Sequence, residues 1–214
     1  MAATISGTQL RALNPRLAPP RADLIALVLG GALAAGGLTT NRRVRHFMAQ
    51  VMVETGALSS LVESTRYSDP VRLDELFKNV QGVEHARRLI AAGPEAIGNT
   101  IYANKCGNGG VASGDGYRFR GRGFLQVTGR ANYRDIGTLV RLPLEAQPDL
   151  LGEPEPAALA AATYWQKRAI NTAADADDVG TVTFLVNGPA RLHLEERRAW
   201  LLLSSSCCRD SFRC

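Results

Sequence analysis

The sequence predicts a mainly α-helical fold with at most a small β-hairpin, and three observations support this class. Apolar residues recur at the helical spacing i, i+3, i+4 and i+7 along most of the chain. The one run with strand character, residues 124–128, is short. The chain has 214 residues, 45% of them hydrophobic, which is enough to bury a core as a single domain. We expect that domain to span residues 1–203, with a disordered tail over residues 204–214.

The first candidate element is the uncharged stretch 24–40. It is either a buried core helix or a signal segment or membrane anchor. The stretch is short for a membrane span. Pro19, Pro20 and Asp23 precede or open it, as is typical of a helix start. These features favour the core helix, and no stable membrane span is expected.

The next helix is expected over residues 44–54, with Thr39, Thr40 and Asn41 as N-cap candidates. Its apolar face comprises Val44, Phe47, Met48, Val51 and Met52. At about 100° per residue, Glu54 falls roughly 20° from Phe47, on the flank of this face. Gly56 then supplies a stop signal. Glu54 is therefore expected to be partly desolvated.

The remaining elements are read from shorter patterns. Helical spacing recurs at 71–80, 83–92, 94–103, 154–168, 179–186 and 192–203. The glycine-rich segment 107–123 leads into residues 124–128, which form either a short strand or an extended loop. This part of the chain is the expected floor of a cleft.

The composition bears on the charge of the partner and on whether disulfides or a metal site are expected. The 25 Lys and Arg residues against 20 Asp and Glu give a net charge of +5, which favours an anionic partner without identifying it. Of the four cysteines, Cys106 stands alone and Cys207, Cys208 and Cys214 lie near the end, so no disulfide framework is expected. The three histidines are scattered, and no zinc-ligand spacing occurs. We predict no metal.

Two glutamates, Glu54 and Glu63, fit the two-carboxylate route to glycosidic cleavage. That route needs one protonated carboxyl and one ionised carboxylate, and so two contrasting environments. The apolar helical face beside Glu54 favours its protonated form, whereas Glu63 lies in the polar loop 59–70. By spacing alone, however, such a pair is common, with one glutamate ending a helix and the other facing solvent.

Two groups of motifs surround these glutamates. The first comprises HFMAQ at 46–50, ETG at 54–56, LVES at 61–64 and YS at 67–68. The second comprises YAN at 102–104, GNG at 107–109, SGDG at 113–116 and FRGRGFLQVTG at 119–129. Together they resemble the family 19 glycoside hydrolases, especially bacterial and phage members, over residues 8–203.

This resemblance implies a lysozyme-like, mainly helical fold with two helical lobes around a substrate cleft. Family members are chitinases and chitinase-like endolysins, which invert the anomeric centre without a metal or cofactor. Inversion requires carboxyl groups about 6.5 to 9.5 Å apart, so that a water fits between them. The expected substrate is a wall polymer with β-1,4-linked N-acetylglucosamine, with peptidoglycan favoured and chitin next.

The resemblance also implies roles for seven residues. Glu54 is the acid, Glu63 the base, Thr128 a holder of the attacking water, Gln126 and Asn132 subsite residues, Asn187 a wall residue and Arg197 the partner of the acid. Arg198 is the alternative register for that partner. Each has a structural alternative: a turn contact for Gln126 and Thr128, a helix cap for Asn187 and a surface charge for Arg197.

Two departures from the family pattern leave open a weakened enzyme. Val53 stands where a histidine usually precedes the acid, and residues 189–192 replace a glycine-rich stretch. A non-catalytic glycan-binding relative is one alternative. A nucleic-acid-binding protein is another, because residues 117–124 interleave aromatics, arginines and glycines. That segment is a single short copy amid helices, which argues against nucleic acid.

Peptidoglycan is favoured over chitin because the positive charge suits an anionic envelope and no separate chitin-binding module is visible. The protein is expected to act on the cell wall as a monomer, after release by lysis or export.

Overall fold

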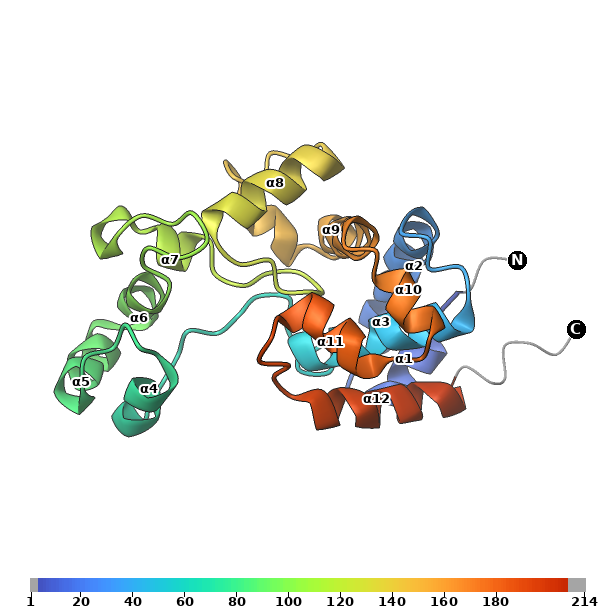
Figure 1. Ribbon diagram of the computed structural model, residues 1–214, viewed down its shortest axis with the longest axis horizontal. Helices are drawn as coiled ribbons and strands as arrows, with labels where there is room; N and C mark the ends of the chain where they lie inside the picture. The colour runs from blue at the N-terminus through green and yellow to red at the C-terminus, as the bar shows by residue number, and fades with distance from the viewer. Residues whose placement is uncertain (1–3, 208–214) are drawn as a thin grey trace, which may run out of the picture. The chain divides into compact units, whose positions relative to one another are not determined.

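The computed structural model describes residues 4–207, and its architecture is mainly α-helical, as predicted (Figure 1). Within these residues, isolated β-bridges join only Val62 to Arg122 and Arg122 to Val127. The elements are α1 (Gly7–Leu13), α2 (Pro19–Ala35), α3 (Asn41–Glu54), α4 (Pro70–Leu76), α5 (Val83–Ala92), α6 (Pro94–Ile101), η1 (Val111–Ser113), α7 (Asp115–Arg118), α8 (Arg130–Val140), η2 (Pro148–Gly152), α9 (Pro154–Lys167), α10 (Ile170–Asp175), α11 (Val179–Asn187) and α12 (Leu194–Cys207).

The described chain divides into two compact units, in agreement with the expectation of two helical lobes. Unit 1 comprises residues 4–61, 123–125 and 151–207, and unit 2 comprises residues 62–122 and 126–150. Each unit has a hydrophobic cluster of its own, so each positions its functional side chains on a packed scaffold.

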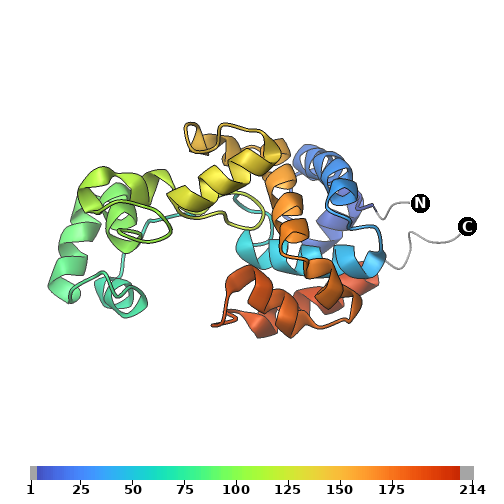
Figure 2. The same cartoon turned by 45° about the horizontal axis from the view of Figure 1, so that its top comes forward.

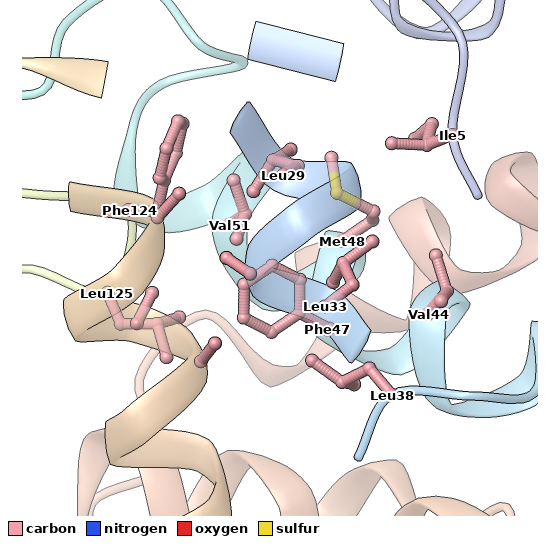
Figure 3. Packing of buried hydrophobic residues seen from close by; sticks show 14 of the residues in the cluster. Ile5, Leu29, Leu33, Leu38, Val44, Phe47, Met48, Val51, Phe124 and Leu125 are labelled. Atoms are coloured by element: carbon pink, nitrogen blue, oxygen red, sulfur yellow. The ribbon is translucent and has the colours of Figure 1, made fainter. Parts of the chain in front are cut away.

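The core of unit 1 forms around α2 and α3. Helix α2 begins at the Pro19-Pro20 pair and buries Ile25, Leu29 and Leu33, which confirms the core helix expected in this region. Figure 3 shows Leu29 and Leu33 grouped with Phe47 and Val51 of α3. Within residues 4–207, no helix combines the length and apolarity needed to cross a membrane.

Helix α3 occupies nearly the predicted range and carries Glu54 at its last position. Thr40 caps its start, where the side-chain oxygen accepts a hydrogen bond from the Arg43 N–H at 3.3 Å. At its end, the Thr55 hydroxyl donates to the Val51 carbonyl and accepts from the Leu58 N–H. The helix packs against α10, α11 and α12 (Figures 1 and 2). Glu54 is thus anchored at the end of a buried helix.

The core of unit 2 is built from α4, α5 and α6, with Leu73, Leu89, Ile97 and Ile101 buried. Helix α5 has the predicted bounds, whereas α4 ends well before residue 80. Phe77, which follows its last residue, is in an extended conformation, and its ring packs edge-on against Tyr67, with ring centroids 5.7 Å apart. Tyr102 follows the last residue of α6 directly, so its position is fixed by this packed helix.

Residues 124–128 form a turn rather than a strand, so the loop alternative is the one observed. Arg122 and Val127 exchange two backbone hydrogen bonds, at 3.1 and 2.8 Å, across the turn. Gln126 adopts a positive φ of 47° in it. Phe124 and Leu125 belong to the core of unit 1 (Figure 3).

The disordered tail predicted from residue 204 is wrong for its first residues, because α12 continues to Cys207. Ser204 is buried, and its hydroxyl donates to the Trp200 carbonyl at 2.8 Å, as serine often does within a helix. Residues 208–214, with Cys208 and Cys214, lie outside the described part of the chain. Helices α1, α7, α8 and α10 were not predicted at all.

Candidate functional site

The first group of candidate residues is the Glu54 cluster, which comprises Glu54, Gln50 and Arg197 of unit 1. Gln50 lies four residues before Glu54, so both side chains project from one face of α3. Arg197, on α12, donates from Nη1 to Gln50 Oε1 at 2.5 Å and from Nη2 to Glu54 Oε1 at 2.6 Å. One guanidinium therefore joins two side chains of the same helix.

The ion pair between Arg197 and Glu54 is largely buried. The side chain of Arg197 is 1% exposed and that of Glu54 is 15% exposed. A pair so little exposed is screened by water and salt much less than a surface pair. The Glu54 carboxylate is therefore held in place by a buried cation.

The geometry distinguishes Arg197 from its neighbour Arg198. Arg198 is half exposed and pairs with Glu195 on the same helix. Arg197, by contrast, also donates from Nε to the Leu192 carbonyl at 3.2 Å. The arginine that contacts Glu54 is thus Arg197, in the register that the resemblance implied.

Tyr164 lies close to the same carboxylate. Its hydroxyl donates to the Leu185 carbonyl at 3.1 Å. Burial raises the pKa of Tyr164, and the charge of Glu54 raises it further, against the opposing effect of Arg168. Tyr164 therefore remains a neutral hydrogen-bond donor at neutral pH.

The second group is the Glu63 cluster, which comprises Glu63, Tyr102, Gly121, Gln126 and Thr128 of unit 2. The Glu63 N–H donates to the Gly121 carbonyl at 2.8 Å, next to the Val62–Arg122 bridge. Its carboxylate accepts from the Tyr102 hydroxyl at Oε1, at 2.6 Å, and from the Gly121 N–H at Oε2, at 2.9 Å. Both oxygens are thus held by neutral donors.

Gly121 is the point on which the side chains of this cluster converge. A Cβ at this position would lie 2.5 Å from Gln126 Oε1, 3.1 Å from Glu63 Oε2 and 3.2 Å from Thr128 Oγ1. Three oxygen-bearing groups therefore fill the space that a side chain would take. The Thr128 hydroxyl also donates to the Gln126 carbonyl at 3.0 Å, which fixes its position in the turn.

Two tyrosines flank Glu63. Burial raises the pKa of Tyr102 far above its ordinary value, and the Glu63 carboxylate raises it further. The pKa of Tyr67 is raised by the same two causes in the same order. Both phenols keep their protons at neutral pH, so Tyr102 remains a donor to Glu63.

The other two predicted site residues make backbone contacts. Asn132 is exposed in the first turn of α8, and its Nδ2 donates to the Thr128 carbonyl at 2.6 Å. Asn187 ends α11, and its Oδ1 accepts from the Leu192 N–H at 2.8 Å. Asn187 therefore closes the loop that contains residues 189–192, one of the two departures from the family pattern. Val53, the other departure, lies half-buried beside Glu54.

Three members of these clusters were not predicted from the sequence: Gln50, Tyr102 and Gly121. A signal existed for Gln50, because a polar residue one helical turn before Glu54 shares its face. Gly121 and Tyr102 lie within motifs quoted for the resemblance, but only the folded chain places them against Glu63.

The arginine-rich segment that suggested nucleic-acid binding is an ordered part of the fold. Arg122 is 2% exposed and donates to Asp149 at 2.6 Å and to the Tyr133 hydroxyl at 3.0 Å. The Arg120 guanidinium lies 4.0 Å from the ring centroid of Tyr117. These two arginines are thus committed to contacts within unit 2.

Comparisons with known proteins relate the chain to a curated family 19 protein and to solved chitinase structures. No family model matches it. A glycosyl hydrolase family 19 domain-containing protein from Haemophilus influenzae is 29% identical over 160 residues, which is 75% of this chain and 78% of the relative. Crystal structures of chitinase C from Streptomyces griseus and of a glutamate-to-glutamine chitinase C mutant match with TM-scores of 0.61 and 0.61, at 18% and 16% identity. Each match covers 95% of this chain and 76% of the chitinase chain.

These findings confirm the resemblance to family 19 and the mainly helical, chitinase C-like fold. They also support the predicted enzyme class, a glycoside hydrolase.

Proposed function

We propose that this family 19-type glycoside hydrolase cleaves β-1,4 bonds in a wall polymer that contains N-acetylglucosamine, by an inverting mechanism with Glu54 as acid and Glu63 as base. The observation that carries the proposal is the contrast between the two carboxyls. Glu54 contacts a buried guanidinium, whereas Glu63 is held by a phenol hydroxyl and a backbone N–H. Such divergent environments are what separate the roles of two catalytic carboxyls.

Glu54 begins the reaction protonated and gives its proton to the glycosidic oxygen as the bond to the anomeric carbon breaks. Negative charge then develops on Glu54, next to the Arg197 guanidinium 2.6 Å away. A charge fixed in place before the reaction stabilises a transition state without reorganisation. Arg197 thus assists proton donation.

Glu63 takes a proton from the water that attacks the anomeric carbon from the opposite face. The new carbon–oxygen bond inverts the anomeric configuration, and solvent restores both carboxyls to their starting forms. The Thr128 hydroxyl lies within the Glu63 cluster and is suited to orient that water. Tyr102 and Gly121 keep the carboxylate in one orientation.

Gln126, Asn132 and Asn187 supply amides for the sugar hydroxyls and acetamide groups. Asn132 uses its nitrogen on the Thr128 carbonyl, which leaves Oδ1 to accept from a hydroxyl. Asn187 uses Oδ1 on the Leu192 N–H, which leaves its nitrogen to donate. The two asparagine amides are therefore oriented before a sugar arrives.

We favour peptidoglycan as the polymer because a net charge of +5 attracts an anionic wall. The test is digestion of purified peptidoglycan and of soluble chitin oligomers, with reducing ends counted and the new termini identified by mass spectrometry. We expect N-acetylhexosamine reducing ends from peptidoglycan. Release from chitin alone would assign chitin as the substrate, and no release from either would favour a glycan-binding relative.

A further inference from the structure

A pocket of about 660 Å³ lies wholly within unit 2, apart from the residues of the Glu63 cluster. It is formed by η1 and α7, by one face of α8 and by the loop that follows α8. We call it the arginine pocket, because Arg118, Arg130, Arg134 and Arg141 line it. Its volume is in the range of small-molecule sites.

The charges around this pocket do not balance. Four arginines face only two acidic lining residues, Asp115 and Glu145, which leaves a surplus of two positive charges. Arg130, Arg134 and Thr138 follow one another at four-residue intervals on α8, so they share one face of the helix. The pocket therefore presents an ordered row of cationic and hydroxyl donors.

Two of the arginines are held in place by the protein. Arg118 donates to the Ala146 carbonyl at 2.9 Å, and Arg130 donates to Glu145 at 2.8 Å and lies 3.6 Å from Asp115. Their guanidinium carbons lie 5.5 and 6.0 Å from the ring centroid of Phe119. These contacts give the pocket two rigid charges.

The surplus belongs to the other two arginines. Arg134 is 58% exposed, and its contact with Asp135 is long, at 3.6 Å. Arg141 caps α8 in the left-handed conformation, with φ of 58°, and within residues 4–207 it makes no ion pair. Both guanidinium groups are thus available to a ligand in a way that Arg118 and Arg130 are not.

One wall of the pocket is apolar. Leu142, Pro143 and Leu144 form it, and the Leu142 N–H donates to the Gly137 carbonyl at 3.0 Å. A Cβ on Gly137 would lie 2.8 Å from the Leu142 carbonyl oxygen, so this glycine permits the close approach of the loop to α8. A carbon face opposite a row of guanidinium groups suits a ligand with an anionic end and a compact, partly apolar body.

We propose that the arginine pocket binds a sugar phosphate. A phosphate monoester carries about −1.5 to −2 charges at neutral pH, which matches the surplus, and guanidinium groups bind phosphate oxygens in pairs. The sugar ring lies against the apolar wall, with its hydroxyls toward Thr138 and Ser113. The phosphate part rests on the arginines alone, whereas the sugar part rests on the proposed function.

Calorimetric titration of the full chain with N-acetylglucosamine 6-phosphate tests the proposal, with N-acetylglucosamine and inorganic phosphate as separate ligands. The pocket variant is Arg134→Ala with Arg141→Ala. The control variant, Arg87→Ala with Arg88→Ala, removes the same charge from exposed positions of α5. We expect the pocket variant to bind the sugar phosphate at least about tenfold more weakly than wild type and the control to bind it as wild type does.

Glu145→Gln supplies a test that gains affinity, because it releases Arg130 from its ion pair and should tighten binding. Equal affinity in the pocket and control variants would overturn the proposal. Equal affinity for inorganic phosphate would overturn its sugar part, and equal affinity for the neutral sugar its phosphate part. None of these outcomes depends on polymer hydrolysis, so failure here is distinguishable from failure of the proposed function.

Discussion

At the scale of single residues, the two glutamates differ in the charge of the groups that hold them. Arg197 offers Glu54 a full positive charge, and such a charge-assisted hydrogen bond strengthens as a carboxyl loses its proton. Tyr102 and the Gly121 N–H offer Glu63 neutral donors, which orient a carboxylate and leave it able to accept a proton. The donors therefore suit an acid and a base respectively.

Removal of the Tyr102 hydroxyl should loosen Glu63 without unfolding unit 2. We expect Tyr102→Phe to lower kcat about tenfold, the effect of a catalytic carboxylate that is less well oriented. Steady-state kinetics on the polymer substrate measures this. Tyr117→Phe, which keeps the ring under Arg120 and removes another hydroxyl of unit 2, is the matched control and should leave kcat unchanged. Equal effects of the two variants on kcat would contradict a role of Tyr102 in orienting Glu63.

Arg197→Lys tests the bridge to Glu54. A lysine cannot reach both Gln50 and Glu54 with the planar fork of a guanidinium. We expect a loss of roughly 1–3 kcal/mol in unfolding free energy, from a buried acceptor left unpaired, together with lower kcat. Denaturant unfolding and kinetics measure the two effects. Arg198→Lys, at the exposed neighbour, should change neither the unfolding free energy nor kcat. A larger effect of Arg198→Lys than of Arg197→Lys would show that Arg198, not Arg197, is the partner of Glu54.

Residue positions were predictable where a helical period or a motif fixed them, whereas the roles of these residues stay predictions. The period placed Glu54 on the flank of a buried face, and the structure locates it there, 15% exposed. The Arg197 contact followed from the resemblance, because its sequence separation from Glu54 carries no local signal. Tyr102 and Gly121 were not predicted for the same reason, because they contact Glu63 only across a long sequence separation.

At the scale of elements, α3 is the scaffold of the Glu54 cluster, and its start depends on one side chain. We expect Thr40→Ala to cost about 1 kcal/mol of unfolding free energy, because the Arg43 N–H loses its capping acceptor. Denaturant unfolding measures this cost. Thr39→Ala, at the exposed residue before the cap, is the control and should be nearly neutral. A control as destabilised as the cap variant would argue against the cap.

Helices with strong apolar periods were predicted well, and the errors have local causes. The helix containing α4 was predicted to extend to residue 80 because Phe77 and Val80 fit the helical period. In the structure the helix ends at Leu76, and the Phe77 ring packs against Tyr67. Helix α8 was missed because it follows directly on the glycine-rich motifs and buries only Tyr133, Ile136 and Gly137. The period of α12 runs into the polar residues from Ser204 on, which the composition alone assigned to a tail.

At the scale of the whole molecule, a buried histidine in the core of unit 1 should make the stability of the fold depend on pH. His46 on α3 is fully buried, and its Nε2 lies 2.7 Å from Asp177 Oδ1. Its Nδ1 is buried without a hydrogen-bond partner among the described residues. Burial lowers the pKa of His46 below its ordinary 6.5, although Asp177 partly opposes this shift. The folded protein therefore binds fewer protons here than the unfolded chain.

This linkage predicts stability that is complete above about pH 6.5 and declines as the pH falls below it. The lowered pKa values of Asp175 and Asp178, which start from 3.8, act only at lower pH. Unfolding by denaturant at about pH 7.5 and about pH 5.5 should show a loss in wild type and a smaller loss in His46→Gln. The same loss in both proteins would assign the pH dependence to other groups.

The two-unit organisation gives each glutamate its own packed support, so loss of either carboxyl should leave the fold intact. The two-glutamate mechanism is tested by comparing the hydrolysis of peptidoglycan and chitin oligomers by wild type, Glu54→Gln and Glu63→Gln, with folding checked by circular dichroism. We expect wild type to release reducing ends and each variant to lose at least about a hundredfold in kcat while still folded. Wild-type rates in either folded variant would contradict the two-glutamate mechanism.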